Sequence, residues 1–139
     1  MERDQIQAQR NALSLQKTVQ NHYNELKKAV EEFKEKCLRV APGRNVPPDI
    51  INEIRGAFKG IRDQLTEIKS IQQLLQTKYR QFYRRDPIRD KEITEFEFLS
   101  KNAYSKFEFI LKEMEAKKKM EKERLAQAGH KNEPSRGSF

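Results

Sequence analysis

The chain has 139 residues, of which 36% are charged and 35% apolar, so it supplies the core of one small domain rather than that of a large globule with deep, dry pockets. It contains no run of about 18 apolar residues, and we therefore expect no transmembrane segment. The net charge of +8 permits attraction to nucleic acid, anionic lipid or acidic proteins but selects none of them. The first residues lack the apolar stretch of a secretory signal, and the single Cys37 cannot form an internal disulfide, so we expect a cytoplasmic or nuclear protein.

The first segment carries an apolar stripe at helical spacing. Its members follow one another by four and three positions, as in the seam of a coiled coil: Val19, Tyr23, Leu26, Val30, Phe33, Cys37 and Val40. Before Val19 the seam is rich in glutamine, and Leu13 and Leu15 fall outside its register. We predict a helix over 4–41 whose N-terminal third needs a partner to cover it.

A proline-rich connection follows, and after it we predict a second helix over 48–85. Its apolar positions alternate by three and four, with one polar member: Ile51, Ile54, Phe58, Ile61, Leu65, Ile68, Gln72, Leu75, Tyr79 and Phe82. Asp49 is placed to cap the first turn. Gln72 either fixes the register or the oligomeric state, or simply lies at the edge of the core.

A glycine pair, Gly56 and Gly60, lies inside the second helix. In membranes this spacing permits close helix contact, and each glycine costs a helix about 1 kcal/mol relative to alanine. Two interpretations stay open. Either another helix approaches this side closely, or the two glycines are exposed and tolerated.

Asp86 and Pro87 divide the second helix from a third, which we predict over 88–128. Its apolar positions again follow helical spacing: Phe96, Leu99, Ala103, Phe107, Ile110 and Met114. The tetrapeptides FEFL and FEFI lie eleven residues apart, close to three turns, so Phe98 and Phe109 form a second apolar face. A β-hairpin over 92–111 is the alternative, because apolar residues also alternate there. We expect Gly129 to end the helix and 129–139 to form a disordered tail.

Half of the net charge lies between residues 78 and 91, where basic side chains are interleaved with aromatic rings. This basic cluster comprises Lys78, Arg80, Arg84, Arg85, Arg89 and Lys91. Arginine forks beside aromatic rings suit a phosphate-rich or acidic partner. The competing interpretation is a helix C-terminus that carries favourable cations, partly neutralised by Asp86 and Asp90.

Residues suited to catalysis are scarce. The histidines are His22 and His130, and Cys37 occupies a seam position, where a small buried hydrophobe is expected. The sequence has no histidine pair at zinc spacing, no glycine-rich phosphate loop and no nucleophile elbow. We therefore predict no enzyme activity, no catalytic residue, no cofactor and no metal site.

These patterns together predict an all-α fold, an elongated antiparallel three-helix bundle or coiled coil with one helical domain over 1–128. The apolar surface left unpaired indicates a non-enzymatic adaptor or structural subunit of a larger intracellular assembly, with helical protein partners in a homo- or hetero-oligomer. The residues predicted to contact a partner are Leu13, Leu15, Phe82, Tyr83, Phe98, Phe109 and Leu111. The alternative function is a basic helical module that binds nucleic acid or an anionic membrane through the basic cluster and a lysine-rich stretch over 117–122.

Overall fold

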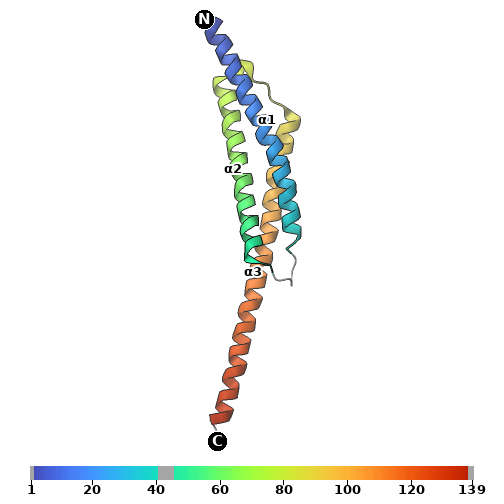
Figure 1. Ribbon diagram of the computed structural model, residues 1–139, viewed down its shortest axis with the longest axis vertical. Helices are drawn as coiled ribbons and strands as arrows, with labels where there is room; N and C mark the ends of the chain where they lie inside the picture. Colours follow the sequence, from blue (N-terminus) through green and yellow to red (C-terminus); the bar gives the residue numbers. More distant parts are fainter. Residues whose placement is uncertain (1, 41–45, 138–139) are drawn as a thin grey trace.

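The computed structural model describes residues 2–40 and 46–137, with side chains up to Ala128. These ranges hold the helices α1 (Glu2–Leu38), α2 (Pro48–Lys78) and α3 (Pro87–Gly137), and the single 3-10 turn η1 (Arg80–Phe82). The helices lie side by side in up-down-up order, and α3 continues alone beyond the end of the other two (Figure 1). The described residues contain no strand, so the hairpin alternative for 92–111 is wrong and the three-helix bundle is confirmed.

The core lies along the predicted apolar seams. The seam residues buried in α1 are Val19, Leu26, Val30, Phe33 and Val40 just after it, and Ala12 extends the core toward the N-terminal third. The predicted seam residues buried in α2 and the turn after it are Ile54, Ile61, Leu65, Ile68, Leu75 and Tyr79. Ile71, which lies outside the predicted seam, is buried as well, whereas the seam residue Gln72 is half-buried. The buried apolar residues of α3 are Ile93, Phe107 and Leu111. Burial of these stripes is what drives three amphipathic helices to pack together.

Polar contacts at the rim of the core connect each pair of helices. Between α1 and α2, Gln64 donates to Glu25 at 2.8 Å, and between α1 and α3 the Tyr23 hydroxyl donates to Glu92. Between α2 and α3, Lys69 pairs with Glu97 at 2.9 Å and Arg55 pairs with Glu108 at 3.3 Å. Exposed ion pairs of this kind contribute little stability.

The ends of α1 and α2 come earlier than the spacing predicted. α1 ends at Leu38 rather than at 41, because two tighter hydrogen bonds close its last turn and bring Val40 into the core: Arg39 N to Lys36 O and Val40 N to Cys37 O, each 3.2 Å. α2 ends at Lys78 rather than at 85. Tyr79 leaves the helical region (φ −118°, ψ 29°), and η1 then carries Phe82 back toward α1. There the side-chain amide of Gln16 donates to the Phe82 carbonyl at 3.0 Å.

The helix starts also differ in which residue acts as the cap. Pro47 is the N-cap of α2 and provides no side-chain hydrogen bond, so Asp49 lies within the first turn and does not cap it. At α3 the carboxylate of Asp86 accepts from the backbone N–H groups of Ile88 and Arg89, each at 3.2 Å. Asp86 therefore caps α3, with Pro87 as its first residue.

The far end of α3 lies beyond Gly129, where the sequence predicted the helix to stop. The helix continues to Gly137, and residues 138–139 lie outside the described ranges. A single glycine costs a helix only about 1 kcal/mol relative to alanine, which is not enough by itself to end it. From Lys112 to Ala128 every side chain except the half-buried Met114 is exposed, so this part, the α3 extension, has no neighbouring helix.

Candidate functional site

The outer face of α3 carries three large apolar side chains that the bundle does not cover. Phe98 is 68% exposed, Phe109 62% and Met120 69%. They are spaced by eleven residues, and eleven residues turn an α-helix by three full turns plus about 20°. The three side chains therefore form one nearly straight line, the outer stripe, about 33 Å long. The exposure of Phe98 and Phe109 agrees with the second apolar face that the sequence predicts, and Met120 extends that face beyond the prediction.

The other residues predicted for partner contact lie in different surroundings. Leu13 is 53% exposed on α1, whereas Leu15, Phe82 and Tyr83 are half-buried against the core. Leu111 is only 6% exposed, so it belongs to the core and is not available to a partner. The reason is its angle on the helix, since Leu111 follows the buried Ser100 by eleven residues and shares its inward face.

The basic cluster gathers at the end of the bundle where α2 gives way to α3. Lys78, Arg80, Arg84, Arg85 and Lys91 are exposed, and Arg89 is half-buried. None of the six forms an ion pair with another described residue. The two carboxylates expected to neutralise part of this charge make hydrogen bonds instead of ion pairs: Asp86 caps α3, and Asp90 accepts from Gln72.

Three cations of the basic cluster are held by uncharged neighbours. The Lys78 ammonium lies 5.6 Å from the centre of the Tyr79 ring. With its amide oxygen turned toward Arg85, Gln76 accepts two hydrogen bonds from that guanidinium, at 2.8 and 2.6 Å. Arg89 donates to the Gln20 side chain of α1 at 3.2 Å. These contacts are made by uncharged groups, so they orient the three side chains without forming an ion pair.

Tyr83, which follows η1 in the chain, packs half-buried against the core and lines a surface hollow together with Arg80 and Arg85. Burial, with the negative charge of Asp90, raises the pKa of its hydroxyl, and Arg89 and Arg85 oppose that shift. The Tyr83 hydroxyl and the Nε of Arg89 are buried and have no hydrogen-bond partner among the described residues. Tyr83 is predicted for partner contact and Arg89 for the basic cluster, but the sequence pattern does not show that these two polar atoms are buried.

The glycine pair of α2 lies open to solvent. A Cβ atom added at Gly56 or Gly60 would meet no atom within 4 Å. No described segment of the chain therefore approaches closely at these positions. Within the bundle, the interpretation of an exposed and tolerated pair is the one that fits.

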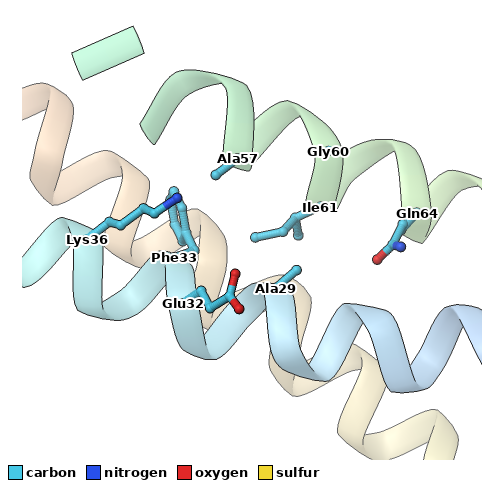
Figure 2. Close-up of a pocket in the computed structure, with 8 residues that line it drawn as sticks. All are labelled: Ala29, Glu32, Phe33, Lys36, Ala57, Gly60, Ile61 and Gln64. Carbon is cyan, nitrogen blue, oxygen red and sulfur yellow. The ribbon is translucent and has the colours of Figure 1, made fainter. Parts of the chain in front are cut away.

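A shallow hollow of about 270 Å³ lies beside Gly60, between α1 and α2. Figure 2 shows Ala29 and Phe33 of α1 facing Ala57 and Ile61 of α2 across the hollow. The small residues in its lining are Ala29, Ala57 and Gly60. Its remaining lining residues are Glu32, Lys36 and Gln64. Among the described residues, those that line the hollow include no serine, cysteine or histidine.

The metal-ligating side chains do not gather into a metal site in the described part of the chain. That part holds no cluster of three or more histidine, cysteine, aspartate or glutamate side chains able to bind a metal ion. Cys37 is half-buried, and burial raises the pKa of its thiol to about 11, which leaves little thiolate at neutral pH.

None of the helices in the described ranges is long and apolar enough to cross a membrane.

Comparison with protein families, with curated proteins and with solved structures finds no match for this chain.

Proposed function

We propose that the chain is a non-enzymatic helical docking module, an adaptor or structural subunit of a larger intracellular assembly, that binds partner helices through the outer stripe. The observation that carries this proposal is the exposure of Phe98, Phe109 and Met120 along one face of a long helix. Burying one such side chain is worth about 1.5–3 kcal/mol, so covering all three gives a partner helix a substantial favourable term. Apolar anchors at helical spacing are also how amphipathic helices recognise one another.

The cell compartment belongs to the same proposal. The thiol of Cys37 is half-buried beside the core and has no second cysteine to pair with, so the fold needs no oxidising environment. This supports a chain that works in the cytoplasm or the nucleus.

The test is capture of partners from extract of the native cell by the full chain, at low and at high salt. We expect capture to persist at high salt, because apolar contacts are not screened. The double variant Phe98→Glu/Phe109→Glu should lose the captured proteins while its helical circular dichroism stays unchanged.

The matched control is Leu125→Glu. Leu125 lies on the same helix, is 73% exposed and lies on the side away from the outer stripe, so this variant should still capture. If the double variant loses its helical signal, the two phenylalanines are part of the core and the proposal fails. Equal loss of capture in the control contradicts it as well.

A second candidate function is the binding of nucleic acid or an anionic membrane through the basic cluster. The observation that favours it is the absence of ion pairs for these six cations within the described residues. The test is the affinity for RNA, for duplex DNA and for anionic vesicles over a range of salt concentrations. Binding that weakens steeply with salt, and that disappears in the Arg80→Ala/Arg84→Ala/Arg85→Ala variant, supports it. Salt-independent or absent binding rejects it.

A further inference from the structure

The outer stripe is symmetric about its middle residue. Phe98 lies eleven residues before Phe109, and Met120 lies eleven residues after it. A helix that pairs with an antiparallel copy of itself about Phe109 therefore places Phe109 opposite Phe109, and Phe98 opposite Met120. If the spacings before and after Phe109 were unequal, the outer apolar residues of the two copies would not lie opposite each other.

A line of charged side chains follows one edge of the outer stripe with the same symmetry. Its members are Glu95, Lys106, Glu113 and Arg124, spaced by eleven, seven and eleven residues, and such steps keep them on one side of the helix. All four are exposed, and none forms an ion pair with another described residue.

Antiparallel pairing about Phe109 sets opposite charges against each other along this edge. Lys106 lies three residues before Phe109, and Glu113 lies four residues after it. Lys106 of one chain therefore faces Glu113 of the other chain. Glu95 and Arg124 lie fourteen residues before and fifteen after, and face each other likewise. The two-fold axis doubles both pairs, so the edge charges are complementary to those of an identical chain.

The α3 extension gains a neighbour in the same arrangement. In one chain the outer stripe begins at Phe98, on the side of the helix away from the buried Ser100, and ends at Met120 on the α3 extension. In the antiparallel pair, the extension of each chain covers the bundle part of the other stripe. One contact thus gives the α3 extension a neighbouring helix and also covers the outer stripe.

We propose that a second copy of this chain docks antiparallel on the outer stripe of α3, with the two-fold axis at Phe109. This inference rests on the proposed function, since it names the occupant of the same face. The pair is isologous and closed, so it predicts a dimer and not a filament.

The first test is sedimentation equilibrium of the full chain over a range of concentrations. We expect a mass that approaches twice the chain mass of 16.5 kDa, and a monomer for Phe109→Glu with unchanged circular dichroism. Leu125→Glu should still form the dimer. A wild-type chain that stays monomeric at the highest soluble concentration overturns the inference, and so does a dimer that survives Phe109→Glu.

The second test is a charge swap at the edge of the stripe. Lys106→Glu turns two attractive pairs into repulsive ones and should weaken the dimer about 10-fold. Adding Glu113→Lys should restore the wild-type dissociation constant. Lack of rescue contradicts the facing of these two positions.

The third test decides the orientation. In a Cys37→Ser background, chains with Lys106→Cys are mixed with differently tagged chains with Glu113→Cys and oxidised gently. Antiparallel pairing brings the two thiols within disulfide reach and yields the mixed product. In a parallel pair these positions lie on opposite sides of the interface, so a dimer without the mixed product overturns the proposed orientation.

These outcomes separate the inference from the proposed function. If the chain is monomeric but still captures other proteins through Phe98 and Phe109, the docking function stands and self-pairing is wrong. If capture and self-pairing are both absent, the docking function fails as well.

Discussion

The rings of Phe58 in α2 and Tyr104 in α3 stack almost flat on each other, with centroids 4.0 Å apart and planes 2° from parallel. Phe33 of α1 lies beside both, at 5.8 Å from Phe58 and 6.5 Å from Tyr104, and Phe107 lies 5.8 Å from Tyr104. One aromatic cluster therefore connects all three helices near the end of the bundle from which the α3 extension leaves.

We expect this stack to couple α2 to α3 energetically. Phe58→Leu and Tyr104→Leu should each destabilise the chain, and the double variant should lose less than the two single losses combined. The expected coupling is about 1 kcal/mol, the usual value for an aromatic pair beyond its buried area. Urea unfolding followed by circular dichroism measures all four free energies of unfolding. Strict additivity would show that the stack adds nothing to simple burial.

Alanine at the glycine pair should stabilise the chain. Gly56→Ala and Gly60→Ala each replace an exposed helical glycine, and the added Cβ meets no atom within 4 Å. The expected gain is up to about 1 kcal/mol per site, because alanine loses less backbone entropy on forming a helix. Thermal unfolding checks the gain, and sedimentation checks assembly. A stable variant that no longer assembles would show that a partner approaches closely at these glycines.

Replacing Gln72 should alter stability slightly and stoichiometry not at all. Its amide donates a 2.9 Å hydrogen bond to Asp90 in the first turn of α3, so within this chain it serves as an α2–α3 contact at the edge of the core. In Gln72→Leu the lost bond is offset by apolar burial, and we expect a net change below about 1 kcal/mol. Urea unfolding and sedimentation equilibrium measure the two quantities. A changed oligomeric state would mean that Gln72 selects the assembly.

The Cys37 thiol should react slowly in the folded chain. Its pKa is raised from 9.0 to about 11 by burial, so the thiolate fraction at about pH 8 should be about 100-fold lower than in the unfolded chain. Iodoacetamide labelling with and without urea measures the ratio of rates. Equal rates would mean that the thiol is open to solvent.

The raised pKa of Cys37 also determines the direction in which the stability of the chain changes with pH. A raised pKa in the folded state means that the stability contributed by the neutral thiol is fully present below pH 9 and is lost as the pH rises toward about 11. Cys37→Ala should lack this part of the alkaline loss. An identical alkaline profile in the variant would assign the loss to other groups, such as Tyr83, whose pKa is also raised.

The three-helix fold was predictable because the apolar seams are regular. Val19 and Leu26 in α1 are seven residues apart, as are Ile54 and Ile61 in α2, a spacing that fits a helix, and all four residues are fully buried. The outward position of Phe98 and Phe109 followed from the same period. Ser100 was not predictable as a core residue, since a serine is polar. Its hydroxyl is satisfied within its own helix by the Glu97 carbonyl at 3.0 Å, which lets it be buried.

Other features depend on contacts between distant segments. Nothing near Tyr79 in the sequence shows that α2 ends there. The end of α2 depends in part on the hydrogen bond from Gln16 to the carbonyl of Phe82, and these two residues are sixty-six positions apart. The hydrogen bond from Arg89 to Gln20 is equally remote in sequence. The prediction that Leu111 contacts a partner is wrong. Leu111 follows Phe107, a member of the predicted seam, by four residues, and this spacing indicates the inward face.

The unbroken passage of α3 from the bundle into the extension also determines how the molecule carries mechanical load. A pull on the extension along its axis acts on α3 alone and must slide its whole buried side past α1 and α2 at once. A sideways pull instead peels the contacts apart one after another. The fold should therefore resist tension along its length far better than tension across it.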